Sequence, residues 1–384
     1  MLMLFSLLHP GTRAQRKSVA RGPNKNFFVY VGTYTTKQTS KGIYLYRFDA
    51  ASGELKEAGL AAQSVDPSFL AVHPNGKYLY AVNEVGEFGT QKSGAVSAFA
   101  IDRATGTLKL LNQVASRGAG PCHISLDRTG KFVFVANYDG GSIASISIQP
   151  DGSLGQAAGF VQHTGHGVDK ERQEAPHAHW ISPSPDNRFV LAADLGLDEV
   201  LIYRFDHTKG TLSANDPPFA KVDPGSGPRH FAFDPGSKFG YALTEMAATV
   251  SAFAWQVQKG SLSTLQTVPT LPKEHSGPRE AAEIAVHPSG KFLYASNRAG
   301  ADTITEFGID AAKGTLTLLG RFPTQGKTPR NFAIDPTGSY LLAANQDSGN
   351  VVVFRIKPTT GELSPTGQVV QVPAPVCVTF VHID

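Results

Sequence analysis

The sequence has little of what would place it in several common classes of protein. It contains only two cysteines, which excludes a disulfide-built scaffold and a cysteine-rich zinc site. No apolar run reaches the roughly 18 to 20 residues of a membrane span. Lys and Arg exceed Asp and Glu by only three residues and form no basic block. We therefore expect no nucleic-acid partner and no membrane partner. Phosphate-loop, GxSxG, HExxH and GxGxxG signatures are also missing.

The first 26 residues form a segment distinct from the rest of the chain. Met1 to Leu8 is apolar but short, and its basic residues come after it rather than before it. We expect residues 1–26 to be a tail, either disordered or the remnant of a signal segment. We expect a cytoplasmic protein, with a secreted or periplasmic one as the alternative because of the apolar N-terminal segment.

Glycine and proline, by contrast, are abundant, with 39 and 25 copies, and they recur in a fixed order. Seven copies of a Gly-x-Leu marker lie 46 to 58 residues apart, which is a mean spacing of about 51 residues. Their glycines are Gly53, Gly106, Gly152, Gly210, Gly260, Gly314 and Gly361. Seven prolines that open apolar runs alternate with them: Pro67, Pro121, Pro176, Pro228, Pro278, Pro329 and Pro375.

Each repeat contains four short runs rich in Val, Ile, Phe, Tyr and Ala, separated by turn residues. In one repeat the expected strands are 69–73, 78–83, 95–101 and 108–114. Four antiparallel strands in about 50 residues, seven times over, predict an all-β, seven-bladed β-propeller. Residues 27–384 would form this single domain. The run 375–382 supplies the inner strand of a blade whose other strands begin at residue 27, so strands from both ends of the chain close the ring.

The inner strands of a propeller line its central channel, and we expect the two residues after each proline to meet the ends of the second strands at one mouth. Polar residues gather at these positions. They include His123, His177, Arg229, His230, Arg279, Arg330, Glu245, Asn297 and Arg298. Arginine suits the bidentate capture of carboxylates and phosphates, which predicts a small anionic ligand. The alternative is structural, because Asn at a strand end also caps turns. Arg229 and Glu245 should lie close together.

Several of these runs resemble a known family. The segments 31–35, 73–84, 176–179, 227–230 and 295–298 resemble the lactonase family of seven-bladed propellers. That family includes propeller-type 6-phosphogluconolactonases and fungal 3-carboxy-cis,cis-muconate lactonizing enzymes. The resemblance implies a metal-independent site without a cofactor, built from a His, two Arg and a Glu. These fall on His177 or His179, on Arg229 and Arg298, and on Glu245.

The leading hypothesis is therefore hydrolysis of 6-phosphogluconolactone, with the histidine at 177 or 179 as base and with Glu245 orienting a partner or acting as the base itself. His123, His230, Arg279, Arg330 and Asn297 would bind this small anionic sugar lactone. The alternatives are a muconate-type cycloisomerase and a non-catalytic binding propeller. We expect a monomer. His163 and His166, in the loop before Pro176, are interpreted as ordinary loop residues, with a lid beside the mouth as the alternative.

Overall fold

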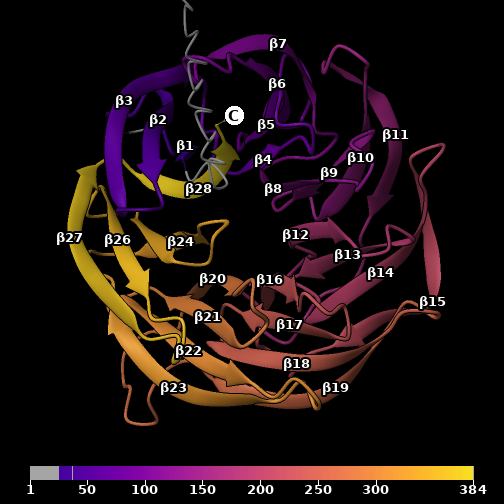
Figure 1. The fold of residues 1–384 in the computed structure, drawn as a ribbon. Coiled ribbons are helices and arrows are strands. Elements are labelled where there is room, and N and C mark those ends of the chain that lie inside the picture. The colour runs from indigo at the N-terminus through magenta and orange to yellow at the C-terminus, as the bar shows by residue number, and fades with distance from the viewer. Residues whose placement is uncertain (1–25, 37, 384) are drawn as a thin grey trace, which may run out of the picture.

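The computed structural model describes residues 26–36 and 38–383 and confirms the seven-bladed propeller (Figure 1). Seven four-stranded antiparallel sheets stand around a central channel, and no helix occurs among these residues. None of them therefore forms a helix that could cross a membrane. Residues 1–25, most of the expected tail, lie outside the described chain.

Each blade runs outward from an inner strand to an outer edge strand. The inner strands are β28 (Pro375–His382), β4 (Leu70–Val72), β8 (Pro121–Leu126), β12 (Ala178–Pro183), β16 (Pro228–Phe233), β20 (Ala281–Val286) and β24 (Pro329–Ile334). The second strands are β1 (Asn26–Thr33), β5 (Tyr78–Asn83), β9 (Phe132–Asn137), β13 (Phe189–Asp194), β17 (Phe239–Thr244), β21 (Phe292–Asn297) and β25 (Tyr340–Asn345).

The third strands are β2 (Gly42–Asp49), β6 (Ala95–Ile101), β10 (Ser142–Ile148), β14 (Glu199–Asp206), β18 (Thr249–Gln256), β22 (Thr303–Ile309) and β26 (Asn350–Ile356). The outer strands are β3 (Glu54–Gln63), β7 (Leu108–Ala115), β11 (Leu154–Gln162), β15 (Thr211–Lys221), β19 (Ser261–Pro269), β23 (Leu316–Pro323) and β27 (Leu363–Gln371). The four strands expected from 69 to 114 are thus present to within one or two residues.

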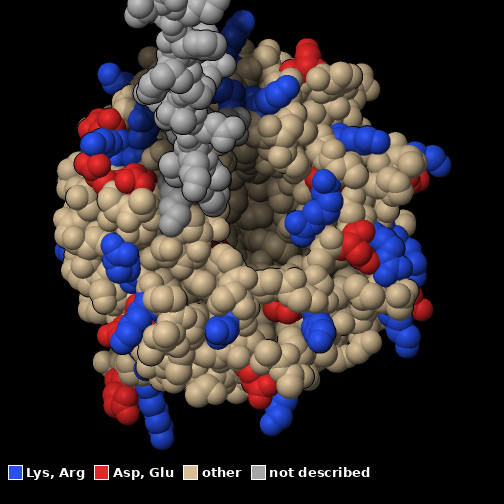
Figure 2. Space-filling model, viewed as in Figure 1, with Lys and Arg blue, Asp and Glu red and all other residues tan. Residues whose placement is uncertain are grey.

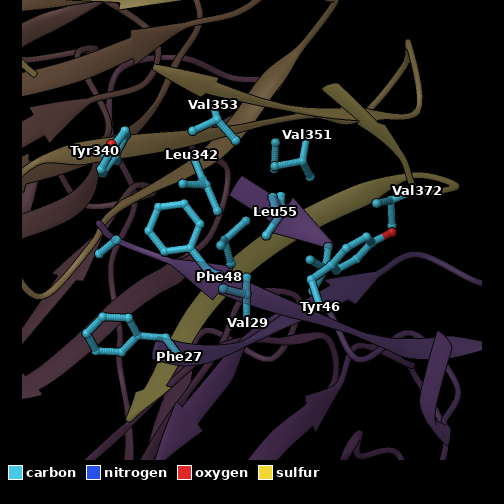
Figure 3. Close-up of a cluster of buried hydrophobic side chains, with 14 residues drawn as sticks. Phe27, Val29, Tyr46, Phe48, Leu55, Tyr340, Leu342, Val351, Val353 and Val372 are labelled. Atoms are coloured by element: carbon cyan, nitrogen blue, oxygen red, sulfur yellow. The ribbon is translucent and has the colours of Figure 1, made fainter. Parts of the chain in front are cut away.

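The ring closes as predicted, with strands from both ends of the chain in one blade. β28 pairs antiparallel with β1, from Phe27 opposite His382 to Thr33 opposite Pro375 (Figure 1). An apolar cluster then joins this blade to the last one, with Phe48 of β2 edge-on to Tyr340 of β25 (Figure 3). The hydrophobic cores therefore lie between neighbouring blades as well as within them.

The Gly-x-Leu marker has a packing reason. All seven of its glycines have a positive φ, between 63° and 85°. A Cβ at any of them would lie only 2.2–2.7 Å from an aromatic carbon of the preceding blade, as at Gly210 against Phe132. Only glycine accepts both the backbone angle and the close ring, so the repeat marks the contact that joins each blade to the next.

Candidate active site

The channel mouth is shaped by a β-bulge at the start of the inner strands. Pairing with the second strand shifts by one residue in six blades, for example between Pro228 and His230 of β16; in β20 the two residues Ala282 and Glu283 lie opposite the single residue Ser296. A bulge leaves a residue without a partner and re-aims its side chain, a device often found beside active sites. The unpaired residues are Cys122, His179, Arg229, Ala282, Glu283, Arg330 and Val376.

Five of these residues, Cys122, His179, Arg229, Arg330 and Val376, line one pocket in the central channel, whereas Ala282 and Glu283 do not. The space-filling view shows that the ring is hollow at its centre (Figure 2). Six of the seven blades contribute to its wall, so the pocket lies in the channel itself. The lining residues are Tyr34, Ser68, Phe69, Glu84, Cys122, His179, Arg229, His230, Arg330 and Val376.

Glu245, which directly follows β17, is the centre of a cationic cluster beside this pocket. Its Oε2 accepts from Arg229 Nε at 2.8 Å and lies 3.0 Å from Arg298 Nη2. Its Oε1 accepts from Arg172 Nη2 at 2.7 Å. The expected proximity of Arg229 and Glu245 is therefore present. The cluster keeps a surplus of positive charge, which favours an anionic ligand.

The arginines decide the protonation state of Glu245. Burial by itself would raise the pKa of this carboxyl, but Arg298, Arg229 and Arg172 together lower it to about 2. Burial in turn lowers the pKa of Arg298 to about 10, which leaves it charged at neutral pH. A carboxylate with so low a pKa is a weak base. The geometry thus suits Glu245 to holding the arginines rather than to removing a proton from water.

Three histidines, His123, His179 and His230, lie close together at the pocket, and His179 and His230 line it. The rings of His123 and His179 both approach that of His230, with centroids 5.4 and 5.3 Å away. Burial, followed by the nearby charge of Arg229, lowers the pKa of His179 well below its ordinary value. The Nδ1 of His179 is buried and has no hydrogen-bond partner among the described residues. This imidazole is therefore neutral and has a nitrogen available for a ligand or a water.

The structure separates the two candidate histidines of the 176–179 segment. His179 occupies the bulge of β12 and lines the pocket with Arg229. His177 lies at the rim, stacked on Tyr138 at 4.6 Å, with its Nδ1 3.1 Å from the Tyr138 carbonyl and its Nε2 3.3 Å from Glu174. Only His179 of this pair faces the arginine-lined pocket.

Arg330 belongs to a second polar group on the opposite wall. Its Nη2 donates to the Tyr34 hydroxyl at 2.9 Å, and that hydroxyl donates to Glu84, 3.0 Å from Oε2. Burial raises the pKa of Glu84 against the opposing charge of Arg330. Arg330 is therefore at the mouth, as expected, but it is tied to Tyr34.

Glu283 is a channel residue that the sequence patterns did not indicate. It lies 3.0 Å from His230 Nδ1 through Oε1, and Asn331 donates to its Oε2. Burial raises the pKa of Glu283 to about 7. A carboxyl–imidazole pair of this kind fixes the tautomer of His230.

Arg279 does not occupy the channel position predicted for it. β20 begins at Ala281, three residues after Pro278, so Ala282 and Glu283 occupy the channel positions expected for Arg279 and Glu280. Arg279 is exposed in the preceding loop. The proline marker fails here because the bulge lies four and five residues after Pro278, whereas in β8, β16, β24 and β28 it directly follows the proline.

Two further residues predicted to bind the substrate, Asn297 and His123, contact other side chains of the protein and do not line the pocket. Asn297 has its side chain engaged by threonines, with Thr270 donating to Oδ1 and Nδ2 donating to Thr303 and Thr305. Asn297 therefore caps the strand end, which is the structural role considered above as the alternative to substrate binding. His123 is packed between Phe69, at 4.2 Å between ring centroids, and Trp180, outside the pocket lining.

Both cysteines are buried and unpaired, and burial raises the pKa of each thiol. Neither is therefore poised as a thiolate nucleophile. Within residues 26–36 and 38–383, no group of three His, Cys, Asp or Glu side chains is arranged to hold a metal ion.

Comparison with known proteins agrees with this architecture. Residues 28–380 match the family model described as "Lactonase, 7-bladed beta-propeller". The chain is 37% identical over 356 residues to a 6-phosphogluconolactonase from Bacillus subtilis, covering 93% of this chain and 99% of the relative. It is 38% identical over 342 residues to a 6-phosphogluconolactonase from Formosa agariphila, covering 88% and 95%.

A solved structure of similar size gives the same result in three dimensions. The periplasmic gluconolactonase PpgL of Pseudomonas aeruginosa superposes with a TM-score of 0.88 at 34% identity, covering 94% of this chain and all of that one. Sequence and structure agree over nearly the whole propeller, and the chain belongs to the lactonase family of seven-bladed β-propellers.

Proposed function

We propose that the protein hydrolyses a sugar lactone, and most specifically 6-phosphogluconolactone to 6-phosphogluconate, at the pocket between Arg229 and His179. The carrying observation is a buried, neutral imidazole with an unpartnered Nδ1 beside an arginine cluster. The names of the Bacillus and Formosa relatives support the same substrate.

The chemistry assigns a separate task to each group. His179 takes a proton from a water molecule as its oxygen attacks the lactone carbonyl carbon. Negative charge then develops on the carbonyl oxygen, and the guanidinium groups of Arg229 and Arg298 stabilise it. The ring C–O bond breaks, and the imidazolium of His179 returns the proton to the leaving ring oxygen. One lactone and one water thus become one hydroxy acid.

Glu245 acts as a positioning residue in this scheme. It is already ionised and bonded to three arginines, so it holds their guanidinium planes in place before the substrate arrives. Such preorganisation lowers the barrier, because the donors need not reorient as the charge forms. This replaces the alternative in which Glu245 itself serves as the base.

The experiment is acid release from freshly prepared 6-phosphogluconolactone, measured against its spontaneous ring opening. We expect strong acceleration by the wild-type protein and a loss of about 10²-fold or more for His179→Gln. His166→Gln is the matched control, because His166 is an exposed residue of the neighbouring loop. Absence of acceleration by the wild type, or an active His179→Gln variant, would refute the proposal.

We further propose that the enzyme acts as a monomer in the cytoplasm. The P. aeruginosa relative is described as periplasmic, so export is the competing location. Fractionation of the producing cell and light scattering of the purified protein test these two points separately.

A further inference from the structure

The long loop between β11 and β12, residues 163–177, is closed at its base by one buried carboxylate. Asp194, at the end of β13, accepts from the His177 backbone N–H at 2.7 Å through Oδ1. Its Oδ2 lies 2.6 Å from His163 Nδ1. His163 and Asp194 have fully buried side chains, so the interpretation of His163 as an ordinary loop residue is wrong. Both ends of the loop are therefore tied to one point of the blade.

The middle of the loop is braced as well. Gln173 is fully buried, and its Nε2 donates to the Leu195 carbonyl and to Asp198, both at 2.8 Å. Its Oε1 accepts from the backbone N–H groups of Val168 and Asp169. Asp169 in turn accepts from the backbone N–H of Arg172 at 2.9 Å. The backbone that carries Arg172 is thus held by hydrogen bonds on both sides.

Arg172 reaches from this loop to the blade that contains β17. Its Nη2 donates to Glu245 Oε1 at 2.7 Å and approaches the Tyr138 hydroxyl at 3.4 Å. Its side chain is 41% exposed, whereas those of Arg229 and Arg298 are 3% and 8% exposed. Arg172 is therefore the member of the Glu245 cluster that faces the solvent at the mouth.

Arg229 and Arg172 differ in how many of their donors are already engaged in hydrogen bonds. Arg229 is engaged through Nε with Glu245 and through Nη1 with the Ala282 carbonyl. Arg172 uses only Nη2, and its Nε and Nη1 have no hydrogen-bond partner within the described chain. These donors can take up an anion while the bond to Glu245 stays in place. Arginine is well suited to phosphate because its donors are fixed in one plane.

We infer that Arg172 binds the phosphate of the substrate and makes the enzyme selective for a phosphorylated lactone over the same lactone without phosphate. The inference rests on the proposed function, since it assigns one part of that substrate to one side chain. The buried arginines then act at the lactone carbonyl, and Arg172 acts at the far, charged end. Lactone hydrolysis as such does not need Arg172, because Glu245 still forms ion pairs with Arg229 and Arg298 when Arg172 is replaced.

The test compares two lactones, 6-phosphogluconolactone and glucono-1,5-lactone, in three variants. Arg172→Gln should lower kcat/KM for the phosphorylated lactone by about 10- to 100-fold, mainly through KM, since it removes a charge-assisted contact. The loss with glucono-1,5-lactone should be much smaller, because that lactone has no phosphate for Arg172 to bind. Arg172→Lys keeps the cation and should fall between the wild type and Arg172→Gln. Lys170→Gln, an exposed residue of the same loop, is the matched control and should change neither rate.

An equal loss on both lactones would overturn the inference, because Arg172 would then act only through Glu245. Unchanged kinetics with the phosphorylated lactone would overturn it as well. If the wild type hydrolyses neither lactone, calorimetric titration with 6-phosphogluconate and gluconate decides. A preference for 6-phosphogluconate that Arg172→Gln abolishes would support the Arg172 site while the proposed reaction fails. Equal binding of the two acids by the wild type would refute the site.

Discussion

Two buried carboxyl groups of the same channel, Glu245 and Glu283, are held in opposite states. Both are desolvated, which raises a carboxyl pKa, yet Glu245 has a pKa of about 2 and Glu283 a pKa of about 7. Three guanidinium groups lie within 3.0 Å of Glu245. Among the described residues, the Glu283 carboxyl has only His230, Asn331 and the Ile284 backbone N–H as hydrogen-bond partners. Direct contact with cations, rather than depth, decides which carboxyl is a permanent anion.

The largest expected effect comes from neutralising each carboxylate in turn. Glu245→Gln leaves three arginines without their common anion. We expect kcat/KM to fall about 10³-fold and the free energy of unfolding to fall by about 3 kcal/mol. Glu283→Gln should cost far less stability, because it removes no ion pair with arginine. Lactone kinetics and urea unfolding of both variants measure this, and equal losses would erase the contrast between the two sites.

The two carboxyls should also give opposite pH dependences of stability. The folded-state pKa of Glu283 is raised from 4.5 to about 7, so its contribution is complete below pH 4.5 and is lost as the pH rises to 7. The loss amounts to about 3 kcal/mol at most. The pKa of Glu245 is lowered, so its contribution is present above pH 4.5 and is lost as the pH falls towards 2.

Urea unfolding between pH 4.5 and 7 should therefore show a shallower pH dependence in Glu283→Gln than in the wild type. Some dependence should remain, because burial also raises the pKa of Glu306 to about 7. Identical slopes for the variant and the wild type would place the pKa of Glu283 in its ordinary range.

A smaller effect is expected from changing the shape of a cation while keeping its charge. Arg229→Lys cannot donate to Glu245 and the Ala282 carbonyl together, as the planar guanidinium does. We expect a loss of about 10²-fold in kcat/KM, with a decrease of about 1 kcal/mol in the free energy of unfolding. Wild-type kinetics would show that charge alone matters at this position.

The smallest effect is expected from metal removal. Arginines around Glu245 oppose a divalent cation electrostatically, so we expect EDTA to leave the rate unchanged. A rate that EDTA abolishes and calcium or magnesium restores would place a cation among these carboxylates and contradict the assignment of Glu245 to the arginines.

The blades could be predicted from the sequence because one local contact repeats seven times. Each Gly-x-Leu glycine accepts an aromatic ring of the preceding blade, and each such contact leaves the same short pattern in the chain. The mouth could be predicted wherever a proline starts the inner strand at a constant distance from its bulge, as at Arg229 and Arg330.

The rest of the site depends on loop lengths and on contacts between distant blades. In β20 the bulge lies four and five residues after Pro278, so Ala282 and Glu283 occupy the channel positions expected for Arg279 and Glu280. In β12 the bulge lies at His179, beyond the two residues expected after Pro176. Arg172 reaches Glu245 across 73 positions of the chain, and no local pattern indicates such a reach.

The most direct test of the proposed channel site is a crystal structure of the protein soaked with 6-phosphogluconate. We expect the acid in the channel, with its carboxylate at Arg229 and Arg298, His179 beside it and its phosphate at Arg172. A ligand bound on an outer blade surface, or at the channel mouth without contact to Arg229, would contradict this assignment.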